Sequence, residues 1–164
     1  MLGLKVHRKI ESYLKFCKST ALWADAGTGN VNEVNYLWAG LIAEVGEIAE
    51  LVQKNIRDGK AITKDEVMYE LGDVLFYTFL LADLESAFIR DSVLYGSRTS
   101  PLITSPIGTL VRLMVTPSVY NVYHAILAVG EHFGLTFDQI LDGNVRKLKR
   151  RIKNGTIRGS GSHR

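Results

Sequence analysis

Apolar residues recur along most of the chain at steps of three and four positions, which is the period of an amphipathic helix. In the first segment the recurring positions are Val6, Ile10, Tyr13, Leu14, Cys17 and Ala21. The run DAGTGN at 25–30 interrupts the pattern, and a second helix is expected from about 32 to 57 with Gly59 as its C-terminal stop. No alternating strand pattern of useful length is found in the sequence. The pattern therefore predicts an all-α fold.

A third helix is expected to begin at the capping box of Thr63 and Glu66 and to continue to about 88–90. Apolar residues surround this helix on nearly every side, so we expect it at the centre of the bundle. The residues at 96–106 have the composition of a loop, and a short helix is expected at about 106–115.

The last part of the chain again has a helical pattern. A helix at about 117–133 is expected to end at Gly134, and Thr136 caps a final helix that reaches about 153. The residues after it are rich in glycine and are expected to be irregular. The simplest architecture is a four-helix-bundle core with extra short helices and an irregular C-terminal tail.

The composition narrows the class of protein. A chain of 164 residues, 46% of them apolar, suits one domain with a sizeable core. No apolar run is long enough to span a membrane, and the N-terminal residues lack the apolar block of a signal peptide. The single cysteine, Cys17, excludes an internal disulfide framework and suits a reducing compartment. A cytoplasmic protein with no membrane partner is expected.

Charge is distributed unevenly along the chain. The formal net charge is only +3, but the stretch at 145–158 is strongly basic and the middle of the chain is rich in acids. This asymmetry indicates an anionic partner, either a nucleotide phosphate or a nucleic acid.

Two pairs of acids stand inside apolar helical runs, each pair with a spacing of three residues. Glu44 falls in the middle of the apolar stripe of the second helix, and Glu47 lies one step round from it. Glu70 and Asp73 repeat this arrangement in the third helix. Glu66, one turn earlier, could be a fifth acid of the same group.

Carboxylates placed this way need positive charge or protons. Burying one unpaired carboxylate costs several kcal/mol, and like charges nearby make its ionisation harder. A hard divalent cation is the simplest solution, because all-oxygen ligands select Mg²⁺, Mn²⁺ or Ca²⁺. The alternative is that these acids lie at helix edges, where they pair with lysines or face water.

Other kinds of catalytic site have less support in the sequence. A ferritin-like di-iron site needs Glu-x-x-His pairs, which none of the four histidines provides. Cys17 falls on the apolar face of the first helix without a neighbouring base, so we interpret it as a buried small hydrophobe. No phosphate-binding loop of the GxxxxGK[ST] type is present.

The segments GLIAEVGEIAELVQK at 40–54 and YELGDVLFY at 69–77 resemble the MazG-like, all-α nucleoside triphosphate pyrophosphohydrolases. The signature of that superfamily is an ExxE helix, a short turn and an ExxD helix. Its four acids would be Glu44, Glu47, Glu70 and Asp73. The basic stretch NVRKLKRR at 144–151 resembles a later element of the same family.

The chain also departs from the family pattern. Many relatives carry another glutamate where this chain has Ala43, which leaves the number of metal ions open. Residues 86–116 resemble an insertion in a single MazG-like domain spanning 1–164, and they could form part of a substrate lid or a subunit contact.

The resemblance implies hydrolysis of a ribo- or deoxyribonucleoside triphosphate to the monophosphate and pyrophosphate. It implies Mg²⁺, or Mn²⁺ in its place, held by the four acids, with water attacking the α-phosphorus. Either Glu44 or Glu47 is expected to accept the proton of that water. Relatives act as dimers or tetramers, so a homodimer or homotetramer is expected.

Polar and aromatic residues near these motifs are candidates for substrate binding. The polyphosphate would be held by Lys54, Asn144, Lys147, Arg150 and Arg151. Trp38, together with Trp23 and Tyr36, flanks the first acidic motif and could stack on a base. In each case a structural role is the alternative: Lys54 could complement a helix end, the basic run could be a solvated face, and the aromatic rings could belong to the core.

Two other functions remain open from the sequence. A non-enzymatic helical module could bind nucleic acid through its basic stretch at 145–158, although this leaves the acids in the apolar stripes unexplained. A bundle could also use the acids to hold a structural metal ion without catalysis.

Overall fold

The computed structural model describes residues 2–85 and 119–157, and the regular structure within these residues is helical. The helices are α1 (Leu2–Thr20), α2 (Val31–Asp58), α3 (Lys64–Glu85), α6 (Val119–His132) and α7 (Phe137–Lys153). The all-α fold is therefore confirmed for this part of the chain. The loop expected at 96–106, the short helix at 106–115 and the insertion at 86–116 lie outside the described residues.

The ends of α2 are set by its neighbouring polar residues and glycine. The Asn30 side chain accepts a hydrogen bond from the Glu33 backbone N–H, which caps the N-terminus of the helix. Gly59 adopts a left-handed conformation with φ of 66° and donates its N–H to the Asn55 carbonyl at 2.9 Å. Because only glycine adopts this conformation at little cost, the helix stops where the sequence predicts.

Capping boxes begin both α3 and α7. At α3 the Thr63 N–H donates to Glu66 Oε2 at 2.9 Å, and the Glu66 N–H donates to Thr63 Oγ1 at 3.2 Å. Lys60 also pairs with Glu66 at 2.9 Å, and these contacts lower the pKa of the Glu66 carboxyl to about 2. Glu66 is thus committed to the helix cap and is not a fifth member of the acid group. Thr136 and Gln139 form the same motif at α7.

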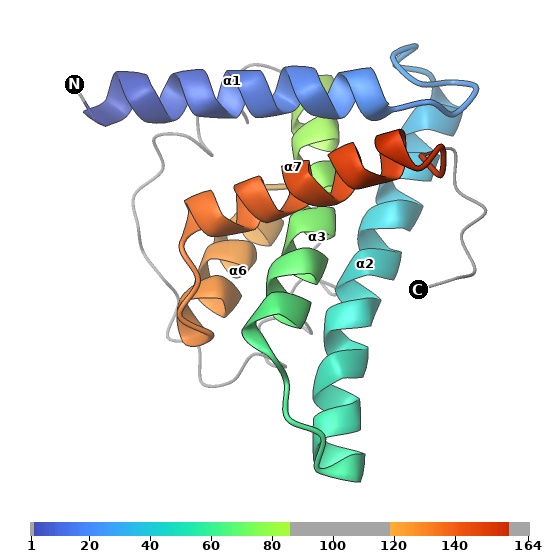
Figure 1. Ribbon diagram of the computed structural model, residues 1–164. Coiled ribbons are helices and arrows are strands. Elements are labelled where there is room, and N and C mark those ends of the chain that lie inside the picture. Colours follow the sequence, from blue (N-terminus) through green and yellow to red (C-terminus); the bar gives the residue numbers. More distant parts are fainter. Residues whose placement is uncertain (1, 86–118, 158–164) are drawn as a thin grey trace.

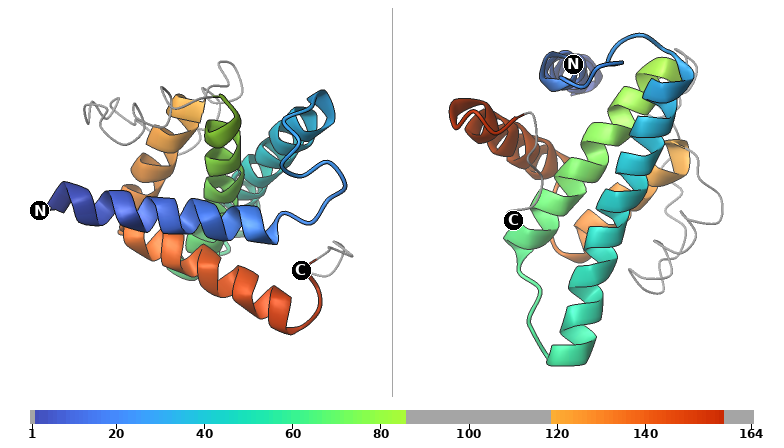
Figure 2. Two further views of the ribbon diagram at one scale, coloured as in Figure 1. Left: turned by 90° about the horizontal axis from the view of Figure 1, so that it is seen from above. Right: turned by 90° about the vertical axis from the view of Figure 1, so that its right-hand side faces the viewer.

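The helices form two layers around α3 (Figures 1 and 2). Helices α2 and α6 lie on either side of α3, while α1 and α7 lie next to each other across one face of this row. Helix α3 packs against all four other helices. Its residues Leu71, Val74 and Leu75 are at most 1% exposed. This arrangement explains why the pattern of α3 is apolar on nearly every side.

Helices α1 and α7, which are distant in sequence, lie next to each other and both pack against α3. Lys9 of α1 forms ion pairs with Asp138 at 3.0 Å and with Asp142 at 3.3 Å, both on α7. The two helices run in the same direction, and the middle of α7 crosses the middle of α3, where Asn144 binds Asp73 (Figure 1). Within the described residues, no helix is long and apolar enough to cross a membrane.

Candidate metal centre and active site

Three of the four acids predicted from the sequence come together between α2 and α3. One carboxylate oxygen from each of Glu44, Glu47 and Glu70 lies within 4.8 Å of the other two. All three side chains are half-buried, and Glu70 Oε2 is buried without a hydrogen-bond partner. We call these three residues the acid cluster. A buried, unpaired carboxylate oxygen is costly, so a ligand at this position would stabilise the fold.

Asp73 lies beside the acid cluster and not among its three converging oxygens. Its side chain is buried, and its Oδ1 atom accepts a hydrogen bond from Asn144 Nδ2 at 2.9 Å. Its Oδ2 atom forms an ion pair with Lys147. Both of these partners belong to α7, so Asp73 connects the acid cluster to the layer of α1 and α7.

The crowded carboxylates hold protons more tightly than ordinary acids. Burial, reinforced by Asp73 and Glu47, raises the pKa of the Glu44 carboxyl to about 7. Burial also raises the pKa of the Glu70 carboxyl to about 6, although Lys147 opposes this shift. Without a cation, the ionised cluster therefore carries more negative charge than Lys147 offsets.

These residues fit a hard divalent cation. The donor set consists of carboxylate oxygens from facing turns of two helices, which is the type of ligand that Mg²⁺ and Mn²⁺ prefer. Glu44, Glu47 and Glu70 would hold the ion, and Asp73 is near enough to Glu44 to raise its pKa. The unpartnered Oε2 atom of Glu70 supports this interpretation more than the sequence spacing alone does.

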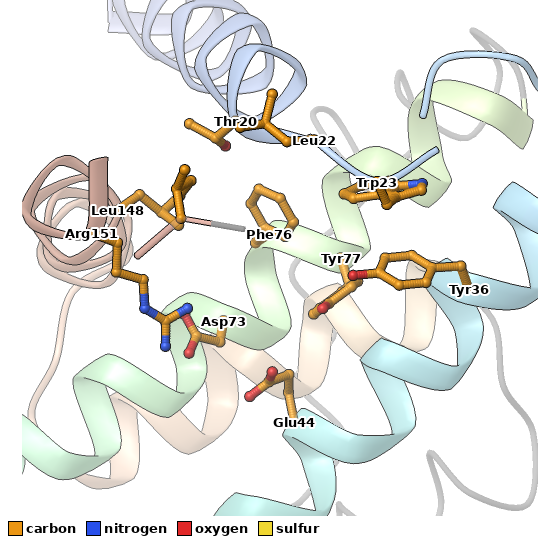
Figure 3. A pocket seen from close by; sticks show the side chains of 11 residues that line it. Thr20, Leu22, Trp23, Tyr36, Glu44, Asp73, Phe76, Tyr77, Leu148 and Arg151 are labelled. Atoms are coloured by element: carbon orange, nitrogen blue, oxygen red, sulfur yellow. The ribbon is translucent and has the colours of Figure 1, made fainter. Parts of the chain in front are cut away.

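A cavity of about 350 Å³ opens next to the acid cluster (Figure 3). Glu44 and Asp73 form one part of its lining, and Arg151 reaches toward Asp73 from α7. The remaining lining residues are mostly apolar: Thr20, Leu22, Trp23, Tyr36, Phe76, Tyr77, Leu148 and Ile157. The cavity thus joins an acidic end, suited to a cation and phosphates, to a wall suited to an apolar ring.

Four aromatic side chains line the cavity: Trp23, Tyr36, Phe76 and Tyr77. We call them the aromatic wall; they come from the loop before α2, from α2 and from α3. Trp23 and Tyr36 stack with ring centroids 4.5 Å apart and an interplanar angle of 26°. Tyr77 of α3 lies against α2 at Gly40, where a Cβ atom would overlap its ring. Trp38, the base-stacking candidate of the sequence analysis, packs against the core and does not line the cavity. Trp23 and Tyr36, its neighbours in that analysis, do line it.

A buried glutamate holds the loop that carries Trp23. The Glu33 carboxylate is 5% exposed and accepts hydrogen bonds from the backbone N–H groups of Gly27 and Gly29, both at 2.7 Å. Both glycines have positive φ, at 78° and 67°. This role of Glu33 cannot be predicted from the sequence, because an acid in the first turn of a helix is common and gives no signal of it.

Only some of the residues predicted to hold phosphates lie at the cavity or at Asp73. Lys147 lies at Asp73, and Arg151 lines the cavity. Lys54 instead pairs with Glu50 at 2.9 Å, and Arg150 is exposed outside the lining. Asn144 is fully buried between Asp73 and Tyr13, so it supports the site from behind.

Comparison with known proteins gives the family. The model of the MazG nucleotide pyrophosphohydrolase domain matches residues 33–96. The Gene 37 protein of Mycobacterium phage L5 is 33% identical over 79 residues, which cover 45% of this chain and 69% of that protein. The chain belongs to the MazG family. No solved structure matches it.

The MazG match includes α2 and α3 with the acid cluster, but it ends before α6 and α7. Trp23 precedes the match, and Lys147 and Arg151 follow it. The acid cluster of this MazG protein thus belongs to the matched part. The aromatic wall and the basic residues are supplied partly by segments outside that part.

Proposed function

We propose that this MazG protein hydrolyses a nucleoside triphosphate, with either ribose or deoxyribose, to the monophosphate and pyrophosphate. The observation that carries the proposal is an acid cluster with an unpartnered carboxylate oxygen, placed beside a cavity with an aromatic wall. A nucleoside triphosphate needs these two surfaces next to each other, because its phosphates require a cation and its base requires a ring to stack on. We propose the cytoplasm as the place of the reaction, a compartment that suits the free thiol of Cys17.

Glu44, Glu47 and Glu70 would hold Mg²⁺, with Mn²⁺ as a substitute, and Asp73 adjoins them. When bound, the cation neutralises phosphate charge and makes an attacking water molecule more acidic. Helices α2 and α3 contribute the ligands from their facing sides, so the spacing of the carboxylates depends on how closely these helices pack.

The reaction is a substitution at the α-phosphorus. The oxygen of a water molecule forms a bond to this phosphorus, the bond to the oxygen bridging the α- and β-phosphates breaks, and pyrophosphate leaves with the electron pair. The proton of the water passes to a carboxylate. Glu44 is better placed than Glu47 to accept it, because Glu44 lines the cavity.

Lys147 and Arg151 of α7 are proposed to hold the polyphosphate. Lys147 neutralises Asp73 in the structure, and Arg151 lies on the cavity wall near the same carboxylate. Cationic side chains in such positions stabilise the charge that develops on the departing phosphates. Lys54 and Arg150 lie farther from the cavity lining, so we assign them no direct contact.

The base is proposed to lie against the aromatic wall formed by Trp23, Tyr36, Phe76 and Tyr77. Stacking on an aromatic side chain contributes about 1–3 kcal/mol per base. Glu44 and the aromatic wall line the same cavity. One nucleotide could therefore place its α-phosphate at the acid cluster and its base against the wall.

We further propose that the protein is a homodimer or a homotetramer that uses the outer face of α2. This face carries small and apolar exposed residues at helical spacing: Ala39, Ile42, Ala43, Gly46 and Ala49. Ile42 is 57% exposed, and a Cβ atom at Gly46 would meet nothing within 4 Å. A second copy of the chain could approach closely along such a surface.

Release of pyrophosphate from a panel of ribo-, deoxyribo- and modified nucleoside triphosphates tests the reaction. We expect release that needs Mg²⁺ and that is lost in Glu47→Gln and Asp73→Asn while the helical circular dichroism stays unchanged. Glu50→Gln is a matched control, because Glu50 lies on the same helix as Glu47 but pairs with Lys54.

The alternatives give different results in the same assays. If Mg²⁺ raises the melting temperature but no triphosphate is cleaved, the acid cluster is a structural metal site and the proposed reaction is wrong. If duplex DNA raises the melting temperature and Mg²⁺ does not, the basic residues of α7 bind nucleic acid instead.

A further inference from the structure

A buried chain of hydrogen bonds connects α1 to the active site. The Tyr13 hydroxyl donates to Asn144 Oδ1 at 2.9 Å, and Asn144 Nδ2 donates to Asp73 Oδ1 at 2.9 Å. Tyr13 is 2% exposed and Asn144 is 0% exposed. The chain of bonds thus joins α1, α7 and α3, and it ends at a carboxylate beside the acid cluster.

The direction of these hydrogen bonds is fixed by chemistry. An ionised carboxylate only accepts hydrogen bonds, so Asn144 must turn its NH₂ group toward Asp73 and its carbonyl toward Tyr13. Tyr13 must then donate, and its proton is retained because burial raises the pKa of its phenol well above the ordinary value. The Asp73 carboxylate therefore sets the direction of the Asn144 amide, and the Tyr13 hydroxyl completes the arrangement by donating to the Asn144 carbonyl.

Asp73 is held from two sides by α7. Asn144 binds one of its oxygens and Lys147 binds the other, so its carboxylate has little freedom to rotate. Asp73 lines the cavity, whereas neither Tyr13 nor Asn144 does. Tyr13 therefore cannot touch a substrate there, and any effect on the reaction must pass through the two residues after it in the chain of bonds.

We propose that Tyr13 is a positioning residue, which acts through Asn144 to orient the Asp73 carboxylate beside the cation site of the acid cluster. The inference rests on the proposed function. Without the Tyr13 hydroxyl, the buried carbonyl of Asn144 loses its hydrogen-bond donor from α1, so the amide is held at one end only and fixes the Asp73 carboxylate less firmly. Loss of such a supporting hydrogen bond typically reduces metal affinity or activity by about 10–100-fold.

The test compares Tyr13→Phe with Tyr123→Phe. Both tyrosine rings pack edge-on against Phe79, with centroid distances of 5.4 Å for Tyr13 and 6.5 Å for Tyr123. Each substitution removes one hydroxyl from a buried ring, but only the Tyr13 hydroxyl bonds to Asn144 among the hydrogen bonds described for these two rings. Two quantities are measured: the Mg²⁺ concentration at half-maximal rise in melting temperature, and kcat for pyrophosphate release at saturating Mg²⁺.

We expect Tyr13→Phe to raise the Mg²⁺ midpoint or lower kcat by about tenfold or more, and Tyr123→Phe to change both by less than about twofold. Adding Tyr13→Phe to Asn144→Ala should cause no further change in either quantity, because Asn144→Ala already breaks the chain of hydrogen bonds. A Tyr13→Phe protein that melts at a lower temperature but keeps both quantities within twofold would overturn the inference. So would a full additional effect in the Asn144→Ala background.

Failures of the inference and of the proposed function are distinguishable. If the wild-type protein binds Mg²⁺ but releases no pyrophosphate, the proposed reaction is wrong, and the Mg²⁺ midpoint alone decides the role of Tyr13. If Tyr13→Phe does not fold, Asn144→Leu removes both the donor to Asp73 and the acceptor of the Tyr13 hydroxyl while the Tyr13 ring stays in place. The same two quantities then decide whether this chain of hydrogen bonds supports the cation site.

Discussion

Gly72 of α3 lies directly against Asn144 of α7. A Cβ atom at position 72 would stand 2.9 Å from Asn144 Cβ and 3.4 Å from its Cα and backbone nitrogen. The neighbouring residue, Asp73, receives the hydrogen bond of the same asparagine. The glycine of the LGD sequence thus allows α7 to approach closely enough to hold the acid that follows it.

Gly72→Ala is therefore expected to push α7 away from α3, because the contact includes backbone atoms that cannot move aside. We expect a loss of about 1–3 kcal/mol in the free energy of unfolding and a fall of about tenfold or more in activity. Urea unfolding and pyrophosphate release measure the two effects. Gly143→Ala is the control at the same interface, since the three atoms nearest its new methyl group would all belong to the flexible Met68 side chain, the first at 3.0 Å. Equal losses in both variants would contradict the proposed role of Gly72.

The metal-free protein is expected to lose stability as the pH rises from about 5 to 8. Folding raises the pKa of Glu44 from 4.5 to about 7 and that of Glu70 from 4.5 to about 6, so the folded state binds more protons than the unfolded state in this range. Because Mg²⁺ competes with these protons, its stabilising effect should grow over the same pH range. Melting temperatures in EDTA and in Mg²⁺ at several pH values check both trends. A melting temperature in EDTA that increases between pH 6 and 8 would show that the carboxylates of the acid cluster do not destabilise the folded state when they ionise.

Glu70→Gln is expected to stabilise the metal-free protein and to weaken Mg²⁺ binding. The substitution removes one of the crowded charges and replaces a buried, unpartnered carboxylate oxygen. We expect a gain of about 1 kcal/mol at pH 8, which corresponds to about 2–4 °C in melting temperature, and an Mg²⁺ midpoint at least about tenfold higher. Thermal melts with and without Mg²⁺ give both values. A variant less stable than the wild type in EDTA would contradict the proposed repulsion among the carboxylates of the acid cluster.

Trp23 and Trp38 are expected to behave differently when replaced by alanine. Trp23 lines the cavity and stacks on Tyr36, so Trp23→Ala should raise KM for the nucleotide by about 5–150-fold, as expected for the loss of about 1–3 kcal/mol of stacking. Trp38 packs against the core, so Trp38→Ala should lower stability with little change in KM. Steady-state kinetics and urea unfolding separate the two. A larger KM effect at Trp38 would restore the role that the sequence first suggested for it.

Ile42→Glu is expected to dissociate the proposed oligomer. It places a charge in the middle of the small, apolar face of α2, where Ile42 is 57% exposed. Ile56→Glu is the matched control, because Ile56 is even more exposed, at 72%, but lies in the last turn of α2. Light scattering coupled to size-exclusion chromatography measures the mass of both variants. A monomeric wild-type protein, or an Ile42→Glu protein of unchanged mass, would argue against this surface.

Residues that act on their near neighbours in the sequence determined most of the helix ends, and helical periodicity determined the class of the fold. Asn30, Gly59 and Thr136 act through atoms only a few residues away, so their roles could be predicted without knowledge of the tertiary structure. The spacing of Glu44 and Glu47 likewise follows from one helix, because residues three apart lie on neighbouring positions of its surface. Together with the acids of α3, this pattern was enough to predict a cation site and the MazG family.

Tertiary structure alone decided how α1 and α7 complete that site. Asp73 has the same spacing from Glu70 as Glu47 has from Glu44, yet it binds Asn144 and Lys147, which lie more than 70 residues away. The same packing buries Asn144 behind the site and leaves Trp23, not Trp38, in the cavity wall. Helical periodicity says which residues share a face of one helix, but it does not say which other helix covers that face. The partners of Asp73 and of Tyr13 were therefore set by the crossing of α1 and α7 over α3.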